Sequence, residues 1–172
     1  MAPLDLGIAV GGSDAPADFV RRCQAVDRAE ALGLHSVWLP EGHFTRGASA
    51  SPLLTLAAFA ARTKRIRLGT TSLLISIHHP LRIAEEVSTL DALSGGRVWL
   101  GLGRGFRKPL FQGFGVEPGA KRDRFDLAVD AMLLAWSGEP VRLDGVHFAT
   151  PDGAVRAALR PVQRPHPPLL VA

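Results

Sequence analysis

An acid and a histidine lie two residues apart in the segment Glu41-Gly42-His43-Phe44, which follows an apolar stretch. An imidazole changes its charge near neutral pH, so His43 could act as a general base or as a donor to a bound cofactor ring. It could equally cap the end of the preceding strand. Glu41 could orient His43, or it could pair with an arginine of the following loop such as Arg46.

Two arginines have the position that phosphate binding requires. Arg104 lies in Gly101-Leu-Gly-Arg-Gly105, directly after an apolar segment, and Arg122 lies at the start of an expected helix. A helix N-terminus offers free N–H groups and a favourable dipole, and guanidinium groups bind phosphate in a bidentate manner. We therefore predict that Arg104 and Arg122 form a phosphate clamp. The glycines do not match the dinucleotide fingerprint, because G-x-G-x-G is followed by Phe106-Arg107-Lys108-Pro109.

Two further polar segments interrupt apolar surroundings. Thr70-Thr71-Ser72 places three hydroxyl groups in an expected strand, where they could bond internally or contact a ligand. His78-His79 precedes a helix that begins at Pro80. Because adjacent side chains point in different directions, we predict no metal site there and interpret both histidines as polar groups of the loop.

These candidates are positioned by a strand, crossover helix and parallel strand within Arg65 to Gly105. Ile66 to Leu74 is apolar without alternation, as in a strand covered on both faces. A helix follows from Pro80 and ends at Gly95-Gly96, and Val98 to Leu102 forms the next strand. The same pattern predicts strands at 4–10 and 36–41 and from 169, and helices from about 16 to 32, from 51–52 onward and from about 122 to 136.

The expected strands begin about every 30 residues, the spacing of βα units with short loops. This regularity predicts an α/β fold, a (β/α)8 TIM barrel present here as about its first five strands and four helices. The chain forms one domain over 1–172, with a β-hairpin insertion near 141–148. A doubly wound open sheet is the alternative. Half a barrel would leave two strand edges unpaired.

Composition limits the function classes. The 172 residues are 47% hydrophobic, enough for a core, and the net charge of +4 comes from scattered basic residues. We therefore expect anionic small molecules rather than nucleic acid as partners. The N-terminus lacks the pattern of a signal peptide, and no stretch resembles a membrane span. The single Cys23, expected to be buried, excludes an internal disulfide and favours a cytoplasmic location.

Taken together, several segments resemble the bacterial luciferase-like flavin-dependent monooxygenase family. They are LGLHSVWLPEGHF, SPLLTLAAFAARTKRIRLGTTSLLISIHHPLRIAEEVSTLDALSGGRVWLGLGRG, FGVEP with its following arginine, and RPVQRPHPPLLVA. The resemblance covers essentially the whole chain. It implies a luciferase-like TIM barrel that binds reduced FMN, or coenzyme F-420 in a sister branch, and uses oxygen to oxidise a small organic substrate. It also implies a homodimer through the second and third helices, with a flavin reductase as a candidate partner.

The resemblance assigns roles to individual residues. His43 matches the active-site histidine of deazaflavin-dependent relatives, whereas Gly42 replaces the histidine that serves as a base in luciferase itself, so light emission is not expected. Thr71-Ser72 matches a bulge against the flavin ring, where relatives carry a non-proline cis peptide. Arg104 and Arg122 match arginines that hold the flavin phosphate. The alternatives are a non-catalytic half barrel and a phosphate-binding barrel without redox chemistry.

Overall fold

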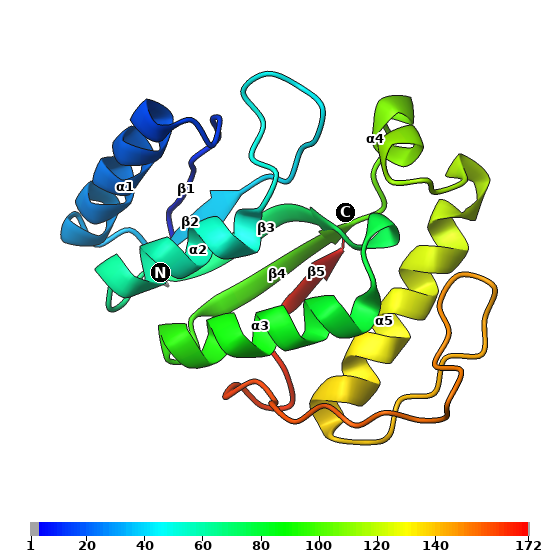
Figure 1. Ribbon diagram of the computed structural model, residues 1–172. Coiled ribbons are helices and arrows are strands. Elements are labelled where there is room, and N and C mark those ends of the chain that lie inside the picture. Colours follow the sequence, from blue (N-terminus) through cyan, green and yellow to red (C-terminus); the bar gives the residue numbers. More distant parts are fainter. Residues whose placement is uncertain (1–3, 172) are drawn as a thin grey trace.

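Five parallel strands in chain order form the centre of the computed structural model, which describes residues 4–171 (Figure 1). The strands are β1 (Gly7–Ala9), β2 (Ser36–Leu39), β3 (Arg67–Leu74), β4 (Val98–Gly103) and β5 (Leu169–Val171). Each strand pairs with the next one in sequence, so the order is never reversed. This order confirms the barrel-type prediction and excludes the doubly wound alternative, which requires a reversal.

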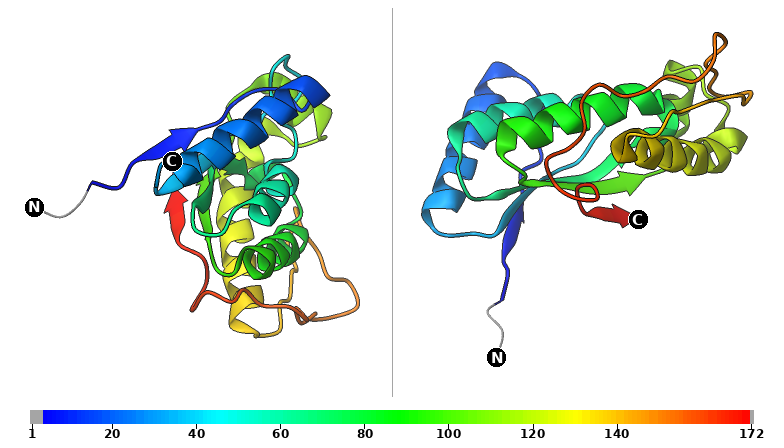
Figure 2. Two further views of the ribbon diagram at one scale, coloured as in Figure 1. Left: turned by 90° about the vertical axis from the view of Figure 1, so that its left-hand side faces the viewer. Right: turned by 90° about the horizontal axis from the view of Figure 1, so that it is seen from below.

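The helices lie on one side of the sheet, and its other side is open in the view from below (Figure 2). They are α1 (Pro16–Ala31), α2 (Pro52–Arg62), α3 (Pro80–Ser94), α4 (Lys108–Gly113) and α5 (Lys121–Ser137), with short 3-10 turns at Ile75–Ile77 (η1) and Pro118–Ala120 (η2). Three of the long helices begin with proline in their first turn, where the missing N–H is tolerated. Among residues 4–171, no helix combines the length and apolarity needed to cross a membrane.

The core lies between the sheet and these helices. Strand residues such as Leu39, Leu68 and Leu100 are fully buried against helix residues such as Phe59 and Trp136. The indole N–H of Trp136 donates to the Ala84 carbonyl oxygen at 3.1 Å, so even this large side chain has its polar group satisfied. Cys23 belongs to the same core and is a free thiol, as expected.

Three segments differ from the sequence prediction. The helix α4 was not predicted, because its six residues are too few for helical periodicity to be recognised. Near 141–148 the chain forms isolated antiparallel bridges, Asp144 with Ala149 and Val141 with Val155, without a continuous two-stranded ladder. The first strand is also shorter than expected, beginning at Gly7; residues 1–3 lie outside the described part.

The amino-terminal edge of the sheet is fixed by two charged side chains. Arg97 is buried and donates to the Thr63 hydroxyl at 2.8 Å and to the Ala60 and Ile66 carbonyl oxygens at 3.0 Å. Glu30, near the end of α1, accepts the backbone N–H groups that lead from α2 into β3, those of residues 64, 65 and 66, at 2.9–3.0 Å. Each of these bonds joins segments that are distant in sequence.

Replacing Glu30 with Gln tests this junction. Burial raises the pKa of Glu30, but the three backbone donors outweigh it and hold the pKa below 4.5. A lowered folded-state pKa means that the stabilisation is present above the unfolded-state pKa and lost as the pH falls through the folded-state value. We expect E30Q to lower the free energy of unfolding by about 1.5–3 kcal/mol at neutral pH in urea titrations. The difference from wild type should shrink below about pH 4.

The matched control is E139Q, because the exposed Glu139 side chain forms no hydrogen bond with another described residue. Equal stability of E30Q and E139Q at neutral pH would contradict the role assigned to Glu30.

Candidate active site

The loops that follow β2, β3 and β4 meet at the carboxyl edge of the sheet, because neighbouring parallel strands all end there. The loop after β2 is closed by a hydrogen bond from the Gly42 N–H to the Ser49 carbonyl oxygen at 2.9 Å. The Glu41 N–H donates to the Ser72 carbonyl oxygen at 3.3 Å and so links the end of β2 to the middle of β3. This edge holds most of the residues with candidate chemistry.

Glu41 is the centre of a cluster with two histidines. Its Oε1 atom lies 2.7 Å from Nε2 of His43 and 2.6 Å from Nε2 of His78, and its Oε2 atom accepts the Leu74 N–H at 2.5 Å. The exposed fractions of the three side chains are 1% for Glu41, 10% for His43 and 25% for His78. Burial raises the pKa of Glu41, but the bonds from the histidines and Leu74 outweigh it, and the net pKa lies below 4.5. Glu41 therefore orients His43, and does not pair with Arg46.

His78 lies in the loop between η1 and α3, where the sequence interpretation placed it, but its hydrogen bond with Glu41 was not anticipated. The two adjacent histidines do point in different directions, as expected: His79 packs against the Phe148 ring, with ring centres 5.5 Å apart. The turn η1 carries His78 back toward β2, a path that no local pattern reveals. Glu41, His43 and His78 each offer one atom that could bind a metal ion, and these three atoms lie within 4.8 Å of one another. The absence of a metal site therefore stays a prediction.

Aromatic side chains cover this cluster from the segment after β4. The Phe114 ring centre lies 4.8 Å from that of His43 and 5.5 Å from that of Phe44, in edge-on or tilted contacts. The Phe44 ring also lies against Gly113, where a Cβ atom would come within 2.1 Å of it, so a larger residue would displace the ring. Phe114 begins the FGVEP segment that resembles the family, but its contact with the histidines joins separate loops and was not predicted.

The three hydroxyl residues of β3 divide into two roles. Thr70 is fully buried and donates its hydroxyl to the Gly101 carbonyl oxygen at 2.8 Å, which is the internal bonding considered from sequence. The Thr71–Ser72 peptide bond is cis, as the resemblance implied, and the pairing register with β4 shifts between Thr70 and Leu73. Thr71 is exposed and Ser72 half-buried. Their contact with a flavin ring stays a prediction.

The two predicted phosphate ligands lie in the expected elements. Arg104 directly follows β4, and Arg122 is the second residue of α5. Both side chains are exposed, and neither forms a hydrogen bond or ion pair with another residue in 4–171. Between them the chain passes through α4 and η2. Each guanidinium is therefore available to an external anion, while their joint action on one phosphate stays a prediction.

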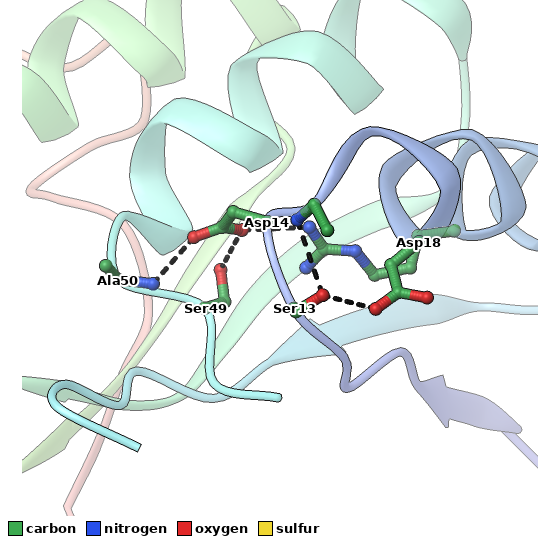
Figure 3. Close-up of polar contacts among 7 residues, drawn as sticks. Ser13, Asp14, Asp18, Ser49 and Ala50 are labelled. Carbon is green, nitrogen blue, oxygen red and sulfur yellow. Dashed lines mark hydrogen bonds and ion pairs between the residues drawn. The ribbon is translucent and has the colours of Figure 1, made fainter. Parts of the chain in front are cut away.

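Asp14 joins the loop after β1 to the loop that carries His43 (Figure 3). Its carboxylate accepts the Ser49 hydroxyl at 2.9 Å, the Ala50 N–H at 2.8 Å and Nη2 of Arg22 at 2.9 Å. Beside it, the Ser13 hydroxyl donates to Asp18 in the first turn of α1. Arg22 is buried, and its Nε and Nη1 atoms have no partner among the described residues. Asp14 thus places a negative charge against the buried Arg22 side chain.

Comparison with known families identifies the chain. A family model described as luciferase-like monooxygenase matches residues 6–172. The chain belongs to this family. Among curated relatives, it is 32% identical over 163 residues to 4-hydroxyprotoasukamycin monooxygenase of Streptomyces nodosus subsp. asukaensis, covering 94% of this chain and 43% of that protein. It is 29% identical over 158 residues to the oxygenase component of the flavin-dependent trigonelline monooxygenase of Acinetobacter baylyi, covering 90% and 42%.

Solved structures of luciferase-like proteins have the same fold. Monooxygenase RslO1 from Streptomyces bottropensis is 35% identical, with a TM-score of 0.89, and the match covers 98% of this chain and 53% of that one. The oxygenating constituent of 3,6-diketocamphane monooxygenase from Pseudomonas putida, in complex with FMN, is 21% identical, with a TM-score of 0.87 and coverage of 98% and 51%. The coenzyme F-420-dependent tetrahydromethanopterin reductase of Methanopyrus kandleri is 24% identical, with a TM-score of 0.74 and coverage of 99% and 50%.

The luciferase-like chain spans about half the length of these relatives. The five strands are therefore part of a TIM barrel of the luciferase-like type, as the sequence predicted. The last two likenesses, at under 25% identity, establish the fold alone.

Replacing Asp14 with Asn tests the link between the two loops. An amide offers one acceptor oxygen and one donor group, so at least one of the bonds from Ser49, Ala50 and Arg22 must be lost. Arg22 and Ser49 both donate to Oδ1, so the amide oxygen should stay there and the NH₂ group should oppose the Ala50 N–H. We expect the Ala50 amide of D14N to exchange with solvent at least tenfold faster, which corresponds to about 1.4 kcal/mol in the opening free energy. The measurement is amide hydrogen exchange by NMR at neutral pH.

The control is D152N, because Asp152 is exposed and its carboxylate forms no hydrogen bond with another described residue. Unchanged exchange of the Ala50 amide in D14N would show that the loop is held by other contacts.

Proposed function

We propose that this chain forms the cofactor-binding part of a flavin-dependent monooxygenase that uses reduced FMN and oxygen to oxidise a small organic substrate. The observation that carries the proposal is the convergence, at one edge of the sheet, of the oriented histidine His43 and the guanidinium of Arg104, which has no partner within residues 4–171. Two similar proteins support it: one is named as the oxygenase component of a flavin-dependent monooxygenase, and the other is described in complex with FMN.

The residues present suit a flavin phosphate. Arg104 and Arg122 are exposed cations that have no partner among the described residues, and guanidinium groups match the geometry of a phosphate. Arg122 also lies in the first turn of the 17-residue helix α5, where backbone N–H groups favour an anion. In this proposal the two arginines hold the phosphate and Thr71-Ser72 supports the ring. A bound reduced flavin would supply the electrons that activate oxygen.

The protein residues near the ring would control protons and water. His43 would hold or release a proton beside the flavin, in an orientation fixed by Glu41. The rings of Phe44 and Phe114 pack against His43 and would exclude water from that side. Gly42 stands at the position of the histidine that serves as a base in luciferase itself, in keeping with oxidation that does not emit light.

Coenzyme F-420 is the second candidate cofactor. It is favoured by His43, which matches the histidine of deazaflavin-dependent relatives, and by the likeness to an F-420-dependent reductase. In that case the chain would transfer a hydride without oxygen. Titration with both cofactors distinguishes the two branches, and binding of neither would favour a non-catalytic half barrel.

Two protein partners follow from the proposal. An oxygenase component needs a separate flavin reductase to supply reduced FMN, as the name of the trigonelline enzyme indicates for that protein. A second copy of this chain is proposed at α2 and α3, where a groove of about 630 Å³ lies between the helices. Leu54 and Leu93 on this groove are 74% and 64% exposed, which is unusual for large apolar residues.

The buried free thiol of Cys23 supports a cytoplasmic location.

Replacing Arg104 with Ala tests cofactor binding. If Arg104 holds the flavin phosphate, R104A should bind FMN about 10- to 100-fold more weakly, because a charge-assisted hydrogen bond is lost. The measurement is quenching of flavin fluorescence, in parallel with coenzyme F-420. The control is R28A, which removes the same charge from the last turn of α1, at the opposite edge of the sheet. Equal affinity of R104A and R28A for FMN would contradict the phosphate assignment.

Replacing Leu54 with Glu tests the proposed dimer. A carboxylate placed in an apolar interface would have to be desolvated, so we expect L54E to be monomeric at concentrations where the wild type is dimeric. Sedimentation velocity measures this directly. The control is L32E, because Leu32 is 63% exposed but lies at the end of α1, away from the groove. A monomeric wild type, or a dimeric L54E, would remove the proposed interface.

A further inference from the structure

Three nitrogen atoms surround the Glu41 carboxylate, and an ionised carboxylate can only accept hydrogen bonds from them. The Leu74 N–H is a donor without alternative, and it faces Oε2 at 2.5 Å. The Nε2 atoms of His43 and His78 both face Oε1, at 2.7 and 2.6 Å. An ionised carboxylate has no hydrogen to donate, so each of these nitrogens must carry the hydrogen of its bond.

We infer that Glu41 is a positioning residue that fixes the protons of two histidines at once, holding both as Nε2–H donors and leaving Nδ1 of each as the free ring nitrogen. The Nδ1 atoms of His43 and His78 form no hydrogen bond with another residue in 4–171. In a neutral imidazole the nitrogen without hydrogen is the acceptor. His43 therefore meets a ligand through Nδ1, and His78 is a second proton-accepting group in the same site.

The surroundings of Glu41 favour the Nε2–H tautomer of both His43 and His78. The Glu41 side chain is 1% exposed, so water is not available to replace a lost partner. The net lowering of its pKa keeps it ionised at neutral pH, where the alternative of a proton on the carboxylate is disfavoured. The Phe114 ring packs against both imidazoles, with ring centres 4.8 Å from His43 and 6.3 Å from His78, and restricts their rotation.

A glutamine at position 41 cannot satisfy the same three donors. Its amide has one oxygen and one NH₂ group. If the oxygen faces the histidines, the NH₂ group opposes the Leu74 N–H; if the oxygen faces Leu74, the NH₂ group opposes the two Nε2–H groups. At least one histidine must then change tautomer, or the Leu74 bond must open.

The test is long-range ¹H–¹⁵N NMR on the full chain with ¹⁵N-labelled histidine, prepared with a chelator and measured at mildly alkaline pH. H43N and H78N assign the signals. We expect both rings of the wild type to be neutral with hydrogen on Nε2. We expect E41Q to convert at least one of them, or to open the Leu74 amide to exchange at least tenfold faster. The control E85Q should retain the wild-type pattern, because the exposed Glu85 side chain forms no hydrogen bond with a described residue.

A bare Nε2 on either histidine of the wild type overturns the inference, as does an E41Q protein with unchanged tautomers and an unchanged Leu74 amide. If E41Q does not fold, the tautomers of the wild type decide the question.

The role of His43 at a cofactor rests on the proposed function, but the tautomers do not. Failure to bind FMN and coenzyme F-420, with both histidines as Nε2–H donors, would remove the proposed function and leave this inference in place.

Discussion

The parallel pairing of β2, β3 and β4 is the constraint on which the site depends. Parallel strands can be joined only by crossovers, so the carboxyl ends of all three strands lie at one edge. Register then decides which residues meet: Leu39 is opposite Thr70, and Thr70 is opposite Leu100. The buried bond from the Thr70 hydroxyl to the Gly101 carbonyl oxygen lies where the register shifts, directly before the Thr71–Ser72 bond.

At that edge, one buried carboxylate organises the loops. Burying a charge is unfavourable unless its acceptor sites are filled, and Glu41 fills them with groups from its own loop and from the segment after β3. The same bonds that make burial tolerable also hold His43 and His78 in place. Phe114, from the segment after β4, completes the enclosure. Three loops are thus held together by contacts that no single loop could make.

The two edges of the sheet differ in what their charged residues do. At the amino-terminal edge, Arg97 and Glu30 bond to backbone groups and join helices to strands. At the carboxyl edge, Arg104 and Arg122 have no partner among the described residues, and the ionised groups that are paired there hold histidines or loops. In βα barrels in general, residues at the amino-terminal edge serve stability, and the active site lies at the carboxyl edge.

The sequence by itself determined the order and type of the main elements. Apolar segments without alternation, prolines in the first turns of helices and glycines after their ends are local signals, and they identified β2 to β4, α3 and α5 to within a few residues. The sequence also marked His43, Arg104 and the Thr71–Ser72 segment, because each directly follows or interrupts an apolar strand. The cis bond came from the family resemblance, and not from any local pattern.

Only the tertiary structure decided which of these residues act together. His78 is 35 positions or more from Glu41 and His43, and its contact depends on how η1 turns the chain after β3. The link from Asp14 to Ala50 and the contact of Phe114 with His43 likewise join separate loops. Sequence patterns report the burial and conformation of neighbouring residues, whereas contacts between loops depend on strand order, register and side-chain packing. For that reason the sequence could identify His43 as a candidate, but the structure was needed to show what holds it.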